Sequence, residues 1–123
     1  FFDRVLLDAP CSGLGALRRR PEARWRKTKK QTLELTELQE ELLFAAIDST
    51  RVGGIIAYVT CSPYLEETWA VVESVLHARA NVQLEDARSL FPGVSNLGEG
   101  PCVQLWPHVH ATDAMFFALL RRV

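Results

Sequence analysis

Two short apolar segments, each followed at once by a loop that contains a cysteine, constrain the fold of this chain more than any other feature. Residues 5–7 (VLL) lead into residues 8–13 (DAPCSG), and residues 55–59 (IIAYV) lead into residues 60–63 (TCSP). Short continuous apolar runs are typical of strands that are buried on both faces of a parallel sheet. The carboxyl ends of parallel strands open onto one crevice, where ligands bind. We therefore expect both thiols and the Asp8 carboxylate to share one pocket.

The remaining apolar pattern predicts further strands and a first long helix. Strands are expected at residues 4–8, 55–60, 81–85, 103–106 and 115–120, with loops at 9–32 and 88–101. A helical repeat starts near Thr36, and Thr36 and Gln39 form an expected capping box. The pair Gly53-Gly54 is expected to end this helix.

A second helix and the order of the elements complete the predicted fold. Ser62 as N-cap and Pro63 as the first helical residue are expected to open this helix. Its expected buried stripe consists of Leu65, Trp69, Val72 and Leu76. Alternating strands and helices predict an α/β fold with a doubly wound, mostly parallel sheet and right-handed crossovers. The last strand follows a loop rather than a helix, so we expect it to be antiparallel.

Length and composition limit the class of protein. With 123 residues, 48% of them hydrophobic, the chain corresponds to one soluble domain or to part of one. No apolar run approaches the roughly 18 residues that a membrane-spanning helix needs. Three cysteines are an odd count for a disulfide framework, which favours a reducing compartment such as the cytoplasm. The chain opens with Phe1-Phe2 rather than Met, and we expect a fragment whose N-terminal portion is absent.

Positive charge is concentrated in one segment, residues 18–30, which we call the cationic segment. It holds eight basic side chains and one acidic one, although the whole chain has a net charge of −1. Arg and Lys side chains beside an aromatic ring are typical of RNA contacts, whereas a solvated surface loop is the structural alternative. The expected RNA-binding residues are Arg18, Arg19, Arg20, Arg24, Trp25, Arg26, Lys27, Lys29 and Lys30.

The loop residues each have a chemical and a structural interpretation. Cys61 directly precedes the expected helix start at Ser62, where free backbone N–H groups favour a thiolate; alternatively, it is a small buried apolar residue. Asp8 either contacts a ligand or caps the following turn, as Asp often does before Pro. Cys11 is either reactive or a packed loop thiol. Cys102 matches no reactive pattern, so we expect a structural role.

Four motifs in one order resemble a known family. They are DAPCSG at residues 8–13, RRxPxxRW at 18–25, TCSPxxEE at 60–67 and WPHxHxTDxMF at 106–116. Together they resemble the C-terminal half of the catalytic domain of RNA (cytosine-5)-methyltransferases of the NOL1/NOP2/Sun group, which includes the bacterial Fmu/RsmB proteins. The resemblance implies a Rossmann-like methyltransferase sheet, S-adenosylmethionine as cofactor, and rRNA or tRNA as partner. It makes residues 1–123 a partial catalytic domain, since the family's glycine-rich cofactor loop lies upstream and has no counterpart here.

The resemblance also implies roles for the residues at the two strand ends. Cytosine C5 is a poor nucleophile, and addition of a thiolate at C6 converts it into a reactive enamine carbon. By resemblance, Cys61 is this nucleophile, Cys11 assists product release, and Asp8 contacts N3 and the exocyclic amine of the base. Asp8 and Pro10 are expected to form a remnant of the cofactor site. The target cytosine must leave its stack to reach both thiols.

Residues of the same motifs are expected at the rim of the active site. These are Ser62, Pro63, His108, His110 and Asp113. His108 and His110 alternate along the chain, which could indicate a metal pair. We expect no metal, because the chain has neither a Cys-x-x-Cys pair nor a suitably spaced histidine cluster.

Two other functions and one physical consequence remain open at this stage. A non-catalytic RNA-binding or ribosome-assembly module would have no need for paired thiols. An amino-methyltransferase would place an aromatic residue after Asp/Asn-Pro-Pro, where this chain has Cys11. If the upstream half of the sheet is absent, the fragment is expected to be inactive. The exposed edge of the strand at residues 4–8 is then expected to cause self-association.

Overall fold

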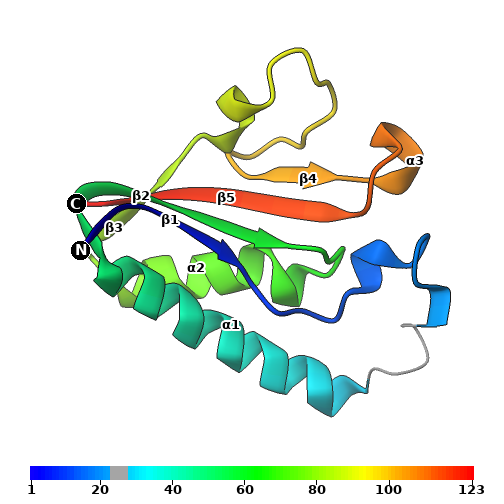
Figure 1. Cartoon of the computed structure of the whole chain (residues 1–123), viewed down its shortest axis with the longest axis horizontal. Coiled ribbons are helices and arrows are strands. Elements are labelled where there is room, and N and C mark those ends of the chain that lie inside the picture. Colours follow the sequence, from blue (N-terminus) through cyan, green and yellow to red (C-terminus); the bar gives the residue numbers. More distant parts are fainter. Residues whose placement is uncertain (23–27) are drawn as a thin grey trace.

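A five-stranded mixed sheet organises the chain, of which the computed structural model describes residues 1–22 and 28–123 (Figure 1). The strand order is β1-β2-β5-β3, and β4 also pairs with β5. β1 and β2 are parallel, whereas β5 runs antiparallel to β2, β3 and β4. Strands β1 to β4 thus run in one direction and β5 runs in the opposite one, which confirms the expected mostly parallel sheet with an antiparallel last strand. The strands are β1 (Phe2–Asp8), β2 (Thr50–Thr60), β3 (Val82–Glu85), β4 (Val103–Leu105) and β5 (Met115–Arg122).

The two longer helices, α1 (Lys29–Ser49) and α2 (Trp69–Ala78), lie on the same face of the sheet and contact each other (Figure 1). The short helix α3 (Pro107–His110) lies near the end of β4. The prediction of a doubly wound sheet is wrong for the described residues. The opposite face of β5 is covered instead by the segment that carries Ala87 and Leu97 and by β4. None of the described helices has the length and apolar character needed to cross a membrane.

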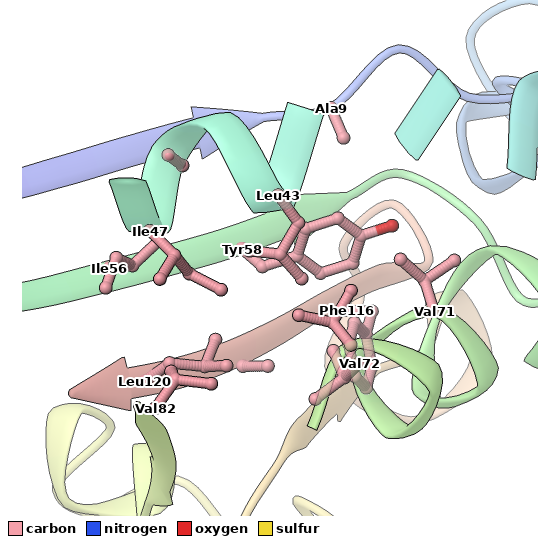
Figure 2. Close-up of a cluster of buried hydrophobic side chains, with 13 residues drawn as sticks. Ala9, Leu43, Ile47, Ile56, Tyr58, Val71, Val72, Val82, Phe116 and Leu120 are labelled. Atoms are coloured by element: carbon pink, nitrogen blue, oxygen red, sulfur yellow. The ribbon is translucent and has the colours of Figure 1, made fainter. Parts of the chain in front are cut away.

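Alternation along β5 divides the apolar side chains between the two faces of the sheet. Phe116, Ala118 and Leu120 point toward the helices and join the main core, whereas Phe117 and Leu119 join the smaller cluster on the other face. This is the period of two that an extended strand imposes. The main core, drawn in Figure 2, combines side chains from α1, α2 and the sheet: Leu43, Ile47, Ile56, Tyr58, Val71, Val72, Val75 and Val82.

The start of α1 differs from the prediction. The N-cap is Thr28, whose hydroxyl accepts the N–H of Gln31 at 3.2 Å while the Gln31 side chain accepts the N–H of Thr28 at 2.9 Å. Thr36 lies inside the helix and donates its hydroxyl to the Leu33 carbonyl at 2.8 Å. Both sites match the capping-box pattern. The first turns are largely exposed, so hydrophobic periodicity could not reveal that the helix begins before Thr36.

The end of α1 also differs, because Gly53 and Gly54 lie inside β2 and not at the helix terminus. Gly53 has a φ of 82°, which is accessible to glycine at little cost. A Cβ on Gly54 would lie 2.9 Å from the carbonyl oxygen of Asp3 on the neighbouring strand. The two glycines thus accommodate an irregularity in the pairing of β1 with β2.

The predicted start of the second helix is wrong as well. Ser62 is not an N-cap, because a 3-10 turn at Leu65–Glu67 precedes α2, which begins at Trp69. Leu65 is 69% exposed and does not belong to the buried stripe. The stripe is formed by Val71, Val72 and Val75, with Trp69 and Leu76 partly buried beside it. The Ser62 hydroxyl donates to the buried carboxylate of Glu67, and its oxygen accepts the N–H of Tyr64, so it supports the loop before the 3-10 turn and not the start of α2.

Candidate active site

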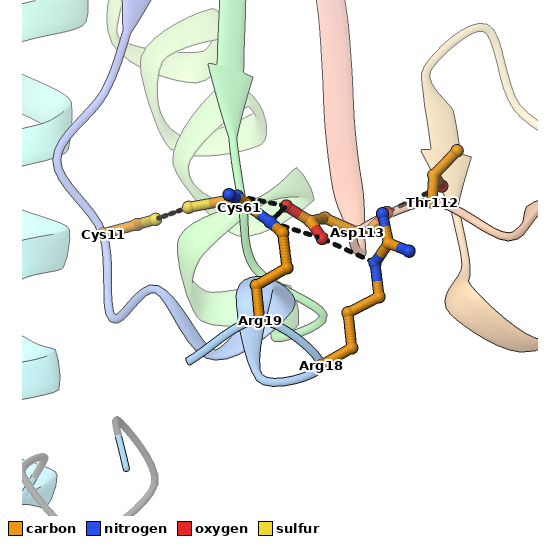
Figure 3. A network of polar contacts seen from close by, with 6 residues as sticks. All are labelled: Cys11, Arg18, Arg19, Cys61, Thr112 and Asp113. Atoms are coloured by element: carbon orange, nitrogen blue, oxygen red, sulfur yellow. Dashed lines mark hydrogen bonds and ion pairs between the residues drawn. The ribbon is translucent and has the colours of Figure 1, made fainter. Parts of the chain in front are cut away.

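The parallel pairing of β1 with β2 brings the two cysteine loops together. Asp8 lies opposite Val59 in the register, so both strands end at the same edge of the sheet. The N–H of Ala9 donates to the Val59 carbonyl at 2.9 Å and continues the pairing beyond β1. The sulfur atoms of Cys11 and Cys61 lie 3.1 Å apart, within hydrogen-bonding distance (Figure 3). Residues fifty positions apart in the chain therefore form one half-buried thiol pair.

The two thiols of this pair differ in acidity. The hydrogen bond from Cys11 is the largest cause that lowers the pKa of Cys61, which is about 7 instead of the ordinary 9.0; a backbone hydrogen bond also lowers it, whereas burial and the charges on Asp8 and Glu67 oppose the shift. The same hydrogen bond, together with burial, raises the pKa of Cys11. Of the two thiols, Cys61 is thus the one that ionises first, and Cys11 is the hydrogen-bond donor. The thiolate is the reactive form of cysteine, so the geometry favours Cys61 as the nucleophile.

The source of this stabilisation differs from the one expected. We expected the N-terminus of a helix beginning at Ser62 to stabilise the Cys61 anion, but α2 begins only at Trp69. The Cys11 thiol takes over this role through its hydrogen bond. The third cysteine, Cys102, packs partly against the main core, and burial raises its pKa to about 11. Cys102 therefore differs from the thiol pair in both place and acidity.

Asp8 and Pro10 lie exposed at the carboxyl end of β1. Among the described residues, the Asp8 carboxylate has no hydrogen-bond partner, so it does not cap the turn that follows it. Its charge acts on Cys61, whose pKa it raises. In the described residues β1 is an edge strand, so Asp8 and Pro10 lie at the edge of this sheet.

Close backbone contacts hold the loops and the residues before β5 together. The N–H of Gly15 donates to the Cys61 carbonyl at 2.9 Å, and the N–H of Ala114 donates to the Gly15 carbonyl at 2.8 Å. A Cβ on Gly15 would lie 2.1 Å from the Ala114 carbonyl oxygen. Only glycine fits at this position without moving the backbone. The turn at Leu14–Ala16 therefore connects both cysteine loops to the start of β5.

Asp113 holds two arginines of the cationic segment beside the thiol pair (Figure 3). Its carboxylate accepts from the Nε of Arg18 at 2.8 Å and from Nη2 of Arg19 at 2.6 Å. These two hydrogen bonds lower the pKa of Asp113, and the Asp113 side chain is only 12% exposed. The negative charge of Cys61 contributes to the raised pKa of Arg19. Asp113 thus orients positive charge at the mouth of the site.

The other basic residues fall into two groups. Arg20, Lys29 and Lys30 are exposed, the last two in the first turn of α1. The remaining predicted RNA-binding residues, Arg24, Trp25, Arg26 and Lys27, lie outside the described residues. A groove of about 360 Å³ lies between the Leu14–Ala16 turn and the start of α1. Its lining includes Leu14, Leu17, Thr28, Lys29, Thr32, Tyr64 and Glu66.

Two residues expected at the rim have other surroundings. Ser62 is fully buried, and its hydroxyl donates to the carboxylate of Glu67. The ring of His110 accepts the N–H of Trp106 on Nδ1 at 3.0 Å and donates from Nε2 to the Ser95 carbonyl at 2.9 Å. It therefore fastens α3 to the preceding loop. Pro63 is half-buried and His108 is exposed. Within residues 1–22 and 28–123, no cluster of His, Cys, Asp or Glu is suited to hold a metal ion.

Sequence reasoning missed Glu67, the buried carboxylate that connects the two loops. Its Oε1 accepts the N–H of Ser12 and its Oε2 accepts the Ser12 hydroxyl, both at 2.7 Å. In the sequence it stood out only as the last residue of the TCSPxxEE motif. The available signal was the serine that follows each cysteine, because both Ser12 and Ser62 turn inward to the same carboxylate.

Comparison with known proteins identifies relatives over nearly the whole chain. The model of the family described as 16S rRNA methyltransferase RsmB/F matches residues 1–121. The chain is 60% identical over 123 residues to the putative methyltransferase Rv1407 of Mycobacterium tuberculosis, covering 99% of this chain and 27% of the relative. It is 38% identical over 135 residues to the 25S rRNA (cytosine-C(5))-methyltransferase nop2 of Schizosaccharomyces pombe, covering 99% of this chain and 22% of the relative.

Solved structures with the same fold include two close matches. PH0851 superposes with a TM-score of 0.87 and 37% identity, over 98% of this chain and 26% of that one. NSun6 from Pyrococcus horikoshii, solved with SFG, superposes with a TM-score of 0.79 and 35% identity, over 96% of this chain and 29% of that one. The chain thus spans about a quarter of the length of the relatives it matches.

Proposed function

The chain belongs to the family of RsmB/F 16S rRNA methyltransferases, and we propose that it forms part of an enzyme that methylates C5 of cytosine in RNA. The observation that carries this proposal is the thiol pair, in which Cys11 and Cys61 lie 3.1 Å apart at the ends of parallel strands. One thiol with a lowered pKa beside another with a raised pKa suits a reaction in which a bond to sulfur is first formed and then broken. A module that only binds RNA has no use for them.

The acidity of Cys61 supports its role as the nucleophile. As a thiolate, it adds to C6 of the cytosine, and a C6–S bond forms while the ring electrons move toward N3. Asp8 lies at the end of the neighbouring strand, and its carboxyl group is the proposed contact for N3 and the exocyclic amine. The addition leaves C5 as an enamine carbon that can accept a methyl group. S-adenosylmethionine, when bound, supplies this methyl group.

Product release supports a second role for Cys11. After methyl transfer, the C5 proton leaves to a base, the C5=C6 double bond reforms, and the C6–S bond breaks to return the Cys61 thiolate. Cys11 holds its proton, because its pKa is raised, and can donate a hydrogen bond to the departing sulfur. The hydrogen bond that would stabilise the leaving thiolate is the same one that lowers the pKa of Cys61 in the free protein.

Exposed basic residues of the cationic segment, two of which are held near the thiol pair by Asp113, support RNA as the substrate. Arg18 and Arg19 are partly exposed while they bond Asp113, and Arg20, Lys29 and Lys30 are exposed. Cations at this position can contact phosphates on either side of an extruded cytosine. By analogy with the bacterial relatives, ribosomal RNA is the proposed substrate. A thiol pair at this distance needs a reducing compartment, which supports the cytoplasm as the location.

We also propose that the 123-residue chain on its own is inactive and binds S-adenosylmethionine weakly. Asp8 and Pro10 lie at the edge of the sheet and form only one side of a cofactor site. The chain spans 27% of the length of its Mycobacterium tuberculosis relative. Tight binding of the cofactor to the 123-residue chain in a calorimeter would contradict this part of the proposal.

Covalent trapping tests the catalytic proposal. The intact protein, given RNA that contains 5-azacytidine and S-adenosylmethionine, should form an adduct that survives denaturation. The adduct should be absent from Cys61→Ala and retained in the matched control Cys102→Ala. With normal cytosine, Cys11→Ala should accumulate an adduct that the parent protein releases. Persistence of the adduct in Cys61→Ala would show that another residue is the nucleophile.

A further inference from the structure

A fully buried carboxylate connects the residues that directly follow the two cysteines. Glu67 is 0% exposed, and the proposed reaction gives it no contact with the base. Its carboxylate accepts the N–H and the hydroxyl of Ser12 at 2.7 Å each, and it also accepts the hydroxyl of Ser62. Ser12 follows Cys11 and Ser62 follows Cys61 in the chain. A single side chain thus bonds both cysteine loops.

We propose that Glu67 is a positioning residue that sets the mutual geometry of Cys11 and Cys61 by holding both loops at once. This inference deepens the proposed function, on which it rests, since it concerns the same site. The backbone of each loop is fixed one residue away from its sulfur atom, so a displacement of Glu67 changes the distance between the two thiols directly.

The directions of the hydrogen bonds explain why this position needs a carboxylate. The Ser12 oxygen lies 3.4 Å from the N–H of Leu14, and the Ser62 oxygen accepts the N–H of Tyr64 at 3.2 Å. Each hydroxyl has one hydrogen to donate, and in both serines it points to Glu67. An ionised carboxylate only accepts and has lone pairs for several donors, which matches this set.

The core holds Glu67 itself in place. The buried hydroxyl of Tyr58 donates to the Glu67 backbone carbonyl at 3.0 Å. From α1, the Nε2 of Gln39 donates to the Pro10 carbonyl at 2.8 Å and lies 3.4 Å from Oε1 of Glu67. The position of the Glu67 carboxylate is therefore fixed by contacts to β2 and to α1, and the carboxylate in turn fixes the positions of the two cysteine loops.

Oxidation of the thiol pair measures its geometry without RNA or cofactor. Diamide takes up the two hydrogen atoms of the thiols as the disulfide bond forms. The rate of this reaction depends on the approach of the two sulfur atoms, because disulfide geometry is specific. The experiment uses the intact protein with Cys102→Ala as the parent, and it follows the Cys11–Cys61 disulfide by peptide mass spectrometry. A thermal melt confirms that each variant is folded.

Two variants change Glu67 in different ways, and a third is the control. Glu67→Asp keeps the charge but is one methylene shorter, so it cannot reach both serines. Glu67→Gln keeps the length but places an amide donor against hydroxyls that already donate. Both should slow disulfide formation about 10- to 100-fold, the range for a displacement of up to about 1 Å. Glu66→Gln makes the same change at the exposed neighbouring residue and should leave the rate unchanged.

Each outcome decides the proposal. Folded Glu67 variants that form the disulfide at the parent rate would overturn it. If neither variant folds, Ser12→Ala and Ser62→Ala decide instead, since each removes one donor to Glu67; slower oxidation in both supports the proposal, and parent rates overturn it. If the Glu67 variants form the disulfide more slowly but the parent protein forms no RNA adduct, the proposed function is refuted and the positioning role of Glu67 stands.

Discussion

Replacing Cys11 with alanine should shift the pH dependence of Cys61 alkylation upward. The hydrogen bond between the two sulfur atoms, 3.1 Å apart, is the largest cause of the lowered pKa of Cys61, which is about 7 instead of 9.0. Burial and the charges of Asp8 and Glu67 raise the pKa of Cys61, a backbone hydrogen bond at Cys61 lowers it by less than burial raises it, and Arg19 interacts with the Cys61 charge. These influences remain in the variant, so the pKa of Cys61 should return to about its ordinary value or above.

The size of the effect follows from two opposing terms. At pH 7, a thiol with a pKa of about 7 is about half ionised, whereas a thiol with a pKa near 9 is about 1% ionised, a loss of about 50-fold in thiolate. The thiolate of higher pKa is intrinsically about eightfold more nucleophilic for this difference in pKa. Alkylation of Cys61 at pH 7 should therefore slow about sixfold. At pH 10 both thiols are ionised, and the variant should react about eightfold faster.

The assay is alkylation by iodoacetamide between about pH 5.5 and pH 10.5, followed at the Cys61 peptide by mass spectrometry. A Cys102→Ala background removes the third thiol. Cys11→Ser keeps an O–H donor, so its inflection should lie between those of the parent and Cys11→Ala. The reasoning fails if Cys11→Ala has its inflection at the parent pH. It also fails if the variant is slower than the parent at every pH, since a lost hydrogen bond requires the two rate profiles to cross.

Three further predictions concern the loops, the RNA and the sheet edge. Gly15→Ala should lower the free energy of unfolding by about 1–3 kcal/mol, because the added Cβ would lie 2.1 Å from the Ala114 carbonyl oxygen. The control Gly100→Ala places its Cβ in open space and should leave the stability unchanged; equal stabilities of the two variants in a denaturant titration would contradict the prediction. If the cationic segment contacts about five phosphates, the logarithm of RNA affinity should fall against that of salt concentration with a slope of about −3.5, and a flat dependence in a filter-binding titration would exclude such contacts. The 123-residue chain should self-associate through the free edge of β1. In sedimentation, Leu6→Lys should reduce this association and the control Leu33→Lys on α1 should not, and a monomeric parent chain at high concentration would refute the prediction.

The strand pattern was predictable because it depends on local properties of the chain. Continuous apolar runs identified β1 and the second half of β2. The short connection before Met115 indicated that β5 is antiparallel, although this connection contains the four-residue helix α3 and is not only a loop. Parallel pairing then implied that Cys11 and Cys61 lie together, and they do. The reactive role of each thiol stays a prediction that only chemistry can test.

Helix boundaries were harder to predict, for a physical reason. The first turns of α1 are exposed and carry no apolar stripe, so a second capping pattern at Thr36 was as good as the actual one at Thr28. Gly53 and Gly54 favour a helix end in any local interpretation. In the folded chain they lie in β2, because backbone atoms of β1 approach Gly54 closely. Neither the start of α1 at Thr28 nor the placement of the two glycines in β2 can be read from the local sequence.

The chain's apolar pattern and its four motifs are sufficient to identify the type of sheet, the cysteine loops and the family. The folded molecule alone reveals why the two thiols differ in acidity and which side chain bonds both of their loops. That information lies in hydrogen bonds between residues fifty or more positions apart, such as Cys11 with Cys61 and Ser12 with Glu67. Such bonds leave no local periodicity, because buried polar groups are paired by tertiary packing and not by their neighbours in the chain.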